Sequence, residues 1–180
     1  PDLDALLIVF APVSVPEGML ERAVYWMSED PRVATVSFLS NAAGALSFPD
    51  RYSPGALDIP GGDEGAVTAL LRGHGPDAGP VPLAVPAGSA IIISRSVLAT
   101  SGGLDAALDA RPREAVLDFA LRASRRGFQH RLDASTFVRS LWHDGFPAAE
   151  PANDDGARER LHQVHSSFPA LYDQQNHVDT

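Results

Sequence analysis

The sequence contains neither cysteine nor lysine. Without cysteine, the chain can form no disulfide bond and no thiolate metal site. All 14 basic residues are arginine, against 23 acidic residues, which gives a net charge of −9 at pH 7. A surface with this excess of negative charge is unsuited to nucleic acid, whose phosphates are also negative. We therefore expect no nucleic-acid partner.

Long apolar runs are also missing. No run reaches the roughly 18–20 residues that span a membrane, and no signal peptide is recognisable. We therefore expect no membrane span and a cytoplasmic location. At 180 residues the chain fits one domain with a sizeable core. Since it does not begin with methionine, we also expect it to belong to a longer protein, with the other domains as partners.

The first part of the chain predicts a strand, a helix and a second strand. Residues 5–10 are continuously apolar and rich in Leu, Ile and Val, a pattern typical of a strand covered on both faces. Pro16 suits the first position of a helix, and Glu17 complements the positive end of the helix dipole. Residues 33–38 then form the second strand. The buried face of the helix is expected to consist of Leu20, Ala23, Val24 and Met27.

Local patterns predict the remaining elements. Helices are expected over residues 63–72, 95–101, 112–126 and near 157–165, and strands over residues 90–93 and 128–138. The clearest helix is the one that Pro112 opens and Gly127 closes. Its core face is expected to consist of Val116, Phe119, Ala120 and Ala123. We therefore divide the chain into an α/β domain over residues 1–139 and a polar C-terminal extension over residues 140–180.

Two sets of residues follow one another in a distinctive order along the chain. The first set consists of Pro16, Glu17 and Gly18, the run from Asp30 to Val33, and Ser40 with Asn41. The second set consists of Gly88, the apolar residues 90–93, Arg95, the Gly-Gly-Leu-Asp run 102–105 and the Asp-Phe-Ala-Leu-Arg-Ala run 118–123. In this order and spacing the chain resembles the family 2 glycosyltransferases of the GT-A fold, and the resemblance implies a partial GT-A-like mixed sheet flanked by helices. It also implies transfer of a sugar from a nucleotide-sugar to a hydroxyl acceptor in glycan or polysaccharide assembly, and the composition is typical of a GC-rich bacterial gene.

The metal motif of that family is absent from this sequence. In the family, a loop after the first strand carries acidic residues that hold Mn²⁺ or Mg²⁺ beside the nucleotide diphosphate. Aligned on Pro16, Glu17 and Gly18, those positions are Phe10 and Pro12 here, and neither side chain can bind a cation. We therefore expect no metal and no other cofactor.

The acidic residues of the family's active site are also largely absent from this sequence. The family's general base is one of two acidic residues, and these positions are Ala115 and Val116 here. Asp118 stays in register, so the resemblance implies it as the candidate catalytic residue. The resemblance further implies a substrate-binding role for Ser40, Asn41, Gly88, Arg95 and His143.

Each of these residues also has a structural interpretation. Asp118 can belong to an exposed ion-pair ladder with Glu114 and Arg122, at a spacing of four residues, and we favour this interpretation. Ser40 and Asn41 can form an Asx turn that ends a strand. His162 and His165 are three residues apart, and we expect a solvated helix rather than a metal site.

We therefore predict a glycosyltransferase family 2-like domain whose catalysis is impaired. The alternative is a non-catalytic pseudoenzyme domain that binds a glycan or a protein. A third hypothesis is an enzyme that uses a different residue set, such as Asp118, Glu114 and His143.

Overall fold

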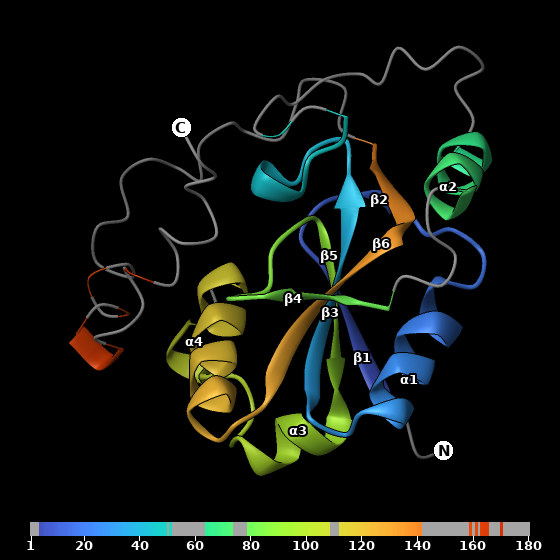
Figure 1. Ribbon diagram of the computed structural model, residues 1–180. Coiled ribbons are helices and arrows are strands. Elements are labelled where there is room, and N and C mark those ends of the chain that lie inside the picture. Colours follow the sequence, from blue (N-terminus) through green and yellow to red (C-terminus); the bar gives the residue numbers. More distant parts are fainter. Residues whose placement is uncertain are drawn as a thin grey trace.

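The computed structural model of the protein describes residues 4–49, 51, 64–73, 79–108, 112–141, 159, 161, 163–165 and 170. Within these residues, a six-stranded mixed sheet lies between helices on its two faces (Figure 1). The predicted α/β class is therefore confirmed. No helix in the described part of the chain combines the length and apolarity that a membrane crossing needs.

The sheet combines antiparallel and parallel pairs in the order β1–β5–β3–β6–β2, and β4 also pairs with β6. β5 runs antiparallel to both β1 and β3, whereas β3 and β6 are parallel. The strands are β1 (Ala5–Val9), β2 (Val13–Ser14), β3 (Val33–Ser40), β4 (Val81–Leu83), β5 (Ala90–Ser94) and β6 (Gln129–Ser140).

The helices divide between the two faces of the sheet (Figure 1). α1 covers one face, α3 and α4 cover the other, and α2 packs against β6. The helices are α1 (Met19–Glu29), α2 (Glu64–Gly73), α3 (Arg95–Thr100) and α4 (Pro112–Arg125), with single 3₁₀ turns η1 (Gly44–Leu46) and η2 (Ala106–Leu108). The predicted N-cap of α2, Asp63, lies outside the described residues.

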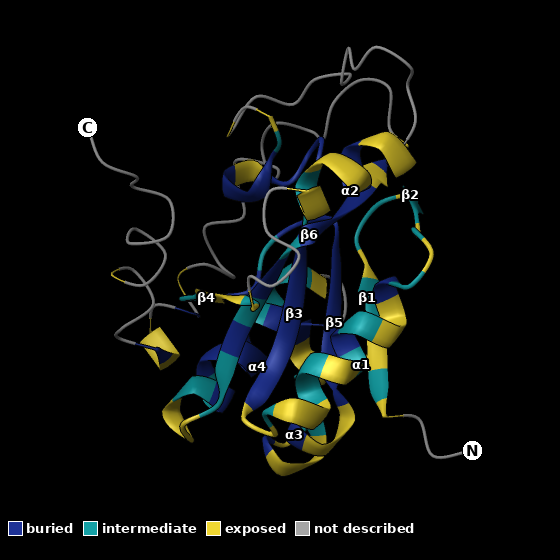
Figure 2. Cartoon of the chain, turned by 45° about the vertical axis from the view of Figure 1, so that its right-hand side comes forward, coloured by how far each residue is buried: buried dark blue, intermediate teal, exposed yellow. Residues whose placement is uncertain are grey.

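The strand predicted over residues 5–10 exists as β1, but the expectation that both of its faces are covered is wrong. β1 is an edge strand, and its Leu6 and Val9 side chains are 40% and 49% exposed. The strand covered on both faces is β5, where Ile92 packs toward α1 while Ile91 and Ile93 pack toward α3 and α4. Figure 2 shows this contrast between buried β5 and half-exposed β1. An apolar run indicates a strand, but the order of strands in the sheet decides which run is central.

The predicted buried face of the first helix is also partly wrong. Leu20 is 44% exposed, whereas Met19 and Ala23 are fully buried against β3 and β5. The helix begins only at Met19, because Gly18 precedes it with a left-handed φ of 79° that an L side chain rarely adopts. Met19, Ala23 and Met27, at a spacing of four residues, therefore form the face toward the sheet.

The helix predicted over residues 112–126 is confirmed as α4, and its core face is correct. Phe119 and Ala123 are fully buried and Val116 is 1% exposed, against β3 and β5. Gly127 has a φ of 85°, and the Phe128 amide donates to Ala123 O at 3.1 Å, which closes the helix as predicted.

The predicted last strand is confirmed as β6, but a bulge interrupts its pairing with β3. Phe38 pairs with Asp133, and Leu39 pairs with Phe137. The Asp133 carboxylate accepts hydrogen bonds from Ser135 and Thr136 within the bulge and from Arg22 on α1 at 2.9 Å. The hydrogen bonds from these three side chains outweigh burial and lower the pKa of Asp133. This buried carboxylate therefore fixes α1 to the bulge.

Candidate functional site

Three of the predicted site residues gather where β1 and β3 end and β5 begins. The Phe10 amide donates to Ser89 O at 2.9 Å, which joins the end of β1 to the start of β5. Gly88 has a φ of 107°, and a Cβ at this position would lie 3.5 Å from Phe38 O. The glycine is therefore explained by the backbone path at this junction, beside Ser40 and Asn41 at the end of β3.

Ser40 and Asn41 hold β3 to β6. They are 1% and 9% exposed. The Asn41 side chain donates to Ser140 O at 3.2 Å and accepts from the Ser140 amide at 2.7 Å, so it continues the ladder between the strands. The Ser40 hydroxyl accepts from the Ala42 amide at 3.3 Å, which is a serine side-chain turn. The hydrogen bonds of the Asn41 side chain to Ser140 reach across to β6 and are not those of the predicted Asx turn. These contacts give both residues a structural role.

Arg113, near the start of α4, completes this junction. Its guanidinium carbon lies 4.5 Å from the centroid of the Phe10 ring, and Nη1 donates to Gly88 O at 3.3 Å. The resemblance implies a divalent metal ion beside position 10, and the residues present do not fit one. Phe10 and Pro12 offer no side-chain oxygen, and the guanidinium already places a positive charge over the ring.

Asp118 lies in a different place, between α4 and the C-terminal region. It is 8% exposed. Its Oδ2 accepts from Arg122 Nε at 2.8 Å, and its Oδ1 accepts from His165 Nε2 at 2.8 Å. Arg122 also donates to Ser101 O, and to Gly103 O at 2.7 Å. The ion pair between Asp118 and Arg122 is therefore confirmed, but the expected exposed ladder is wrong.

His165 lies against Asp118 and is itself fully buried. The expectation of a solvated helix is therefore wrong at His165, although the adjacent Gln163 and Val164 are exposed. Because a carboxylate oxygen can only accept, His165 Nε2 carries the proton in this contact. Its Nδ1 is buried and has no hydrogen-bond partner among the described residues. His162 lies outside the described residues.

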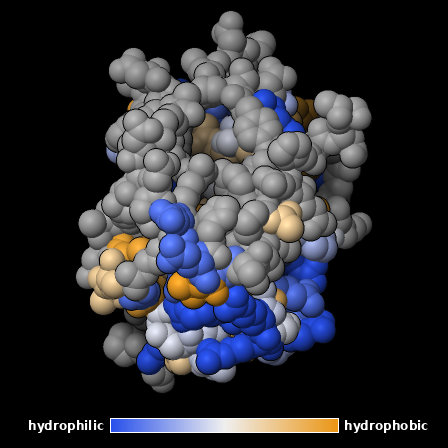
Figure 3. Space-filling view, turned by 90° about the vertical axis from the view of Figure 1, so that its left-hand side faces the viewer, coloured by the Kyte–Doolittle hydropathy of each residue, from blue (hydrophilic) through white to orange (hydrophobic). Residues whose placement is uncertain are grey.

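A cavity of about 530 Å³ opens beside Asp118 and Arg122. One wall consists of the loop that follows α3, with Leu104 and Asp105, and another of Leu161 and Val164 from the C-terminal region. Figure 3 views the side of the molecule that carries α4, where hydrophilic residues gather over the lower part with hydrophobic spots beside them. The cavity therefore joins charged groups to apolar walls.

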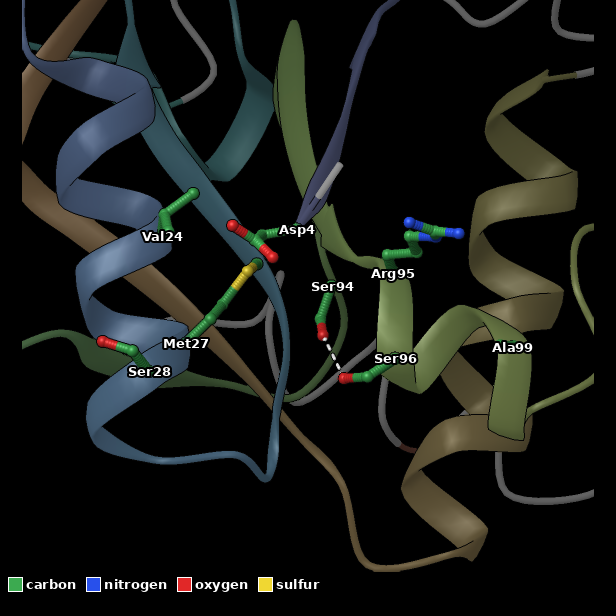
Figure 4. A pocket seen from close by; sticks show the side chains of 8 residues that line it. All are labelled: Asp4, Val24, Met27, Ser28, Ser94, Arg95, Ser96 and Ala99. Carbon is green, nitrogen blue, oxygen red and sulfur yellow. Dashed lines mark hydrogen bonds between the residues drawn. The ribbon is translucent and has the colours of Figure 1, made fainter. Parts of the chain in front are cut away.

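Arg95 lines a second cavity, of about 590 Å³, between α1 and the start of α3. Figure 4 shows Asp4 and Met27 pointing into it, while the Arg95 guanidinium points away toward α4. Ser94 and Ser96 form a hydroxyl pair at 3.0 Å on its floor. Of these two cavities, Arg95 lines one and Asp118 the other. His143 lies outside the described residues.

Two residues of these clusters were not predicted from the sequence. Arg113 carries no motif, and its partner Phe10 lies far away in the chain, so only the fold shows the pair. His165 lies in a polar segment whose sequence indicates solvent exposure, and only the fold shows its contact with Asp118. No three His, Asp or Glu side chains in the described ranges are arranged to hold a metal ion.

No protein-family model matches the chain, and no curated protein matches it in sequence. The resemblance to family 2 glycosyltransferases therefore rests on the motifs quoted above alone.

Proposed function

We propose that this chain is a family 2 glycosyltransferase-like domain that has lost sugar transfer and keeps a binding role in bacterial glycan assembly. The observation that carries this proposal is the state of Asp118, the acidic residue that remains in register with the family. Both of its oxygens face partners, Arg122 and His165, at 2.8 Å. A general base must reach the acceptor hydroxyl within about 2.6–3.2 Å, and a carboxylate held in this way is poorly placed to do so.

The junction at Phe10 supports the same conclusion. Departure of a nucleoside diphosphate requires stabilisation of its negative charge, which a metal ion commonly supplies. Here Arg113 places a guanidinium over Phe10 at the corresponding position. A guanidinium can form two parallel hydrogen bonds to a phosphate without a metal. We therefore expect this domain to bind a nucleotide-sugar in a metal-independent manner that depends on Arg113.

Titration calorimetry with UDP-, GDP- and dTDP-sugars, in Mn²⁺ and in EDTA, tests the proposal. The expected affinity is the same in both solutions and about fivefold or more weaker in Arg113→Gln, because a charge-assisted contact to phosphate is lost. Arg72→Gln, on the exposed side of α2, changes the net charge equally and serves as the control.

Three results would contradict the proposal. The first is micromolar binding that requires Mn²⁺, since it would reveal a metal site. The second is sugar transfer that Asp118→Asn abolishes, since it would make Asp118 a base. The third is the absence of binding by every nucleotide-sugar, which would remove the binding role.

A further inference from the structure

A short part of the C-terminal region docks on α4. We define the C-terminal turn as Leu161 and residues 163–165. Leu161 is 3% exposed and packs with Val85 and Leu121, with Leu117 at the margin. The turn is drawn in red at the left of α4 in Figure 1. It covers the side of α4 that faces away from the sheet, because Phe119 and Ala123 occupy the side toward the sheet.

Among the described residues, two polar contacts join the turn to α4. His165 Nε2 donates to Asp118 Oδ1 at 2.8 Å, and Arg125 Nη2 donates to Val164 O at 2.9 Å. Against these, docking buries His165 Nδ1 without a partner in the described part of the chain. A buried polar atom without a hydrogen bond is unfavourable by roughly 1–3 kcal/mol. Because the unpartnered nitrogen offsets part of the gain from the two hydrogen bonds, we expect the turn to detach from α4 at a lower free energy than the sheet and its core unfold.

We propose that the C-terminal turn is a removable, self-inhibitory cover of the Asp118 cavity. When the turn is docked, Leu161 and Val164 wall the cavity and His165 occupies Asp118 Oδ1. When it is released, the cavity widens and Oδ1 becomes free to accept a hydroxyl group of a sugar-containing ligand. The existence of the cover stands on the contacts alone, whereas its control over a ligand rests on the proposed function.

The absence of cysteine from the chain allows a direct test on the full-length protein. Leu121→Cys places a thiol beneath the turn, and Ala123→Cys places one on the opposite side of the same helix, against the sheet. Under native conditions we expect the thiol at position 121 to react with a disulfide reagent about tenfold or more faster than the thiol at 123, because release of the turn exposes only the former. Leu117→Cys is a second reporter in the same cluster.

The variant His165→Ala then identifies the contact that holds the cover. It should raise the labelling rate at position 121 about fivefold or more and leave the rate at 123 unchanged. Gln163→Ala, an exposed position of the same turn, should change neither rate. Equal labelling rates at positions 121 and 123 would contradict the proposal that the turn is a removable cover. A labelling rate at position 121 that His165→Ala does not alter would contradict it as well.

Calorimetry with the same nucleotide-sugars separates the cover from the proposed function. Tighter binding by His165→Ala than by the wild-type protein supports control by the turn of the Asp118 cavity, which is separate from the Arg113 junction. Equal affinity in the two proteins would overturn that control. Absence of binding in both would instead contradict the proposed function, while the labelling rates would still decide whether the cover exists.

Discussion

The Arg113 guanidinium lies over the ring of Phe10, with 4.5 Å between the guanidinium carbon and the ring centroid. This contact joins the end of β1 to the beginning of α4, two elements that are distant in the sequence. Arg113 also donates to Gly88 O, so it touches the start of β5 as well. The pair therefore occupies the junction of three elements on which the proposed nucleotide-sugar site depends.

We expect Phe10 and Arg113 to be energetically coupled. In a double-mutant cycle of Phe10→Leu and Arg113→Gln, the coupling free energy should be about 0.5–1 kcal/mol, as for a cation–π pair that is partly open to solvent. Urea unfolding of the four proteins measures it. Phe10→Leu keeps an apolar side chain, which limits the packing loss. Strictly additive effects would show that the two groups do not interact in solution.

Phe119 should be among the most sensitive positions of the core. Its side chain is fully buried between α4 and the sheet. Phe119→Ala should lower the free energy of unfolding by about 3–5 kcal/mol, the usual range for a buried aromatic residue. Leu20→Ala, at a position of α1 that is 44% exposed, is the control. A loss below about 1 kcal/mol for Phe119→Ala would show that α4 presents a different face to the sheet.

The buried face of α4 was predicted correctly and the burial of β1 was not, and the distance in sequence of the deciding contacts explains both outcomes. The face of α4 follows from a spacing of three and four residues, which is local information in the sequence. The position of β1 depends on β5, which lies between β1 and β3 although it comes after both in the chain. No local sequence pattern predicts that order of strands in the sheet. The run of residues 5–10 therefore predicts a strand correctly and its burial wrongly.

The candidate site shows the same division between local and distant information. The pairing of Asp118 with Arg122 was predictable, because one turn of helix separates them. Its burial was not, because His165 reaches Asp118 from a separate part of the chain. Likewise, Asn41 looks like a turn or sugar-binding residue until the backbone of Ser140 is found beside it. Tertiary contacts decide the role of each.

His130 should make the stability of the protein depend on pH. Burial lowers its pKa from 6.5 to about 4. Nε2 lies 3.2 Å from Ala120 O and therefore carries the proton, while Nδ1 accepts from the Thr35 hydroxyl at 2.8 Å. The native state thus favours the neutral ring, and the unfolded chain binds a proton more readily. The stabilisation is complete above about pH 6.5 and is lost as the pH falls toward 4.

The size of this effect follows from the shift in the pKa of His130. It corresponds to about 3 kcal/mol of unfolding free energy between neutral pH and pH 4. Urea unfolding across this range should show a smaller loss in His130→Gln than in the wild-type protein. If the two proteins lost the same free energy on acidification, His130 would not be the group responsible.

Asp133 should matter far more than an exposed acidic residue in a similar ion pair. It is 2% exposed and accepts from Arg22, Ser135 and Thr136. Asp133→Asn removes the charge opposite Arg22 and should destabilise the protein by about 2–4 kcal/mol. Asp30→Asn, which breaks the surface pair with Arg32, is the matched control and should have little effect. Similar results for both variants would show that the bulge does not depend on its carboxylate.

The variant Asp118→Asn distinguishes a structural role of this carboxylate from a catalytic one. If its carboxylate serves to hold Arg122 and His165, Asp118→Asn should lower the free energy of unfolding by about 1–3 kcal/mol, more than the few tenths expected of an exposed helix pair. The same change should leave any sugar transfer unaffected. Glu114→Gln, one turn earlier on α4, is the control for loss of a negative charge.

A rate of sugar transfer that falls more than about a hundredfold in Asp118→Asn, with the fold intact, is what removal of a general base produces. That outcome would make this cavity an active site, with the C-terminal turn lying over its base.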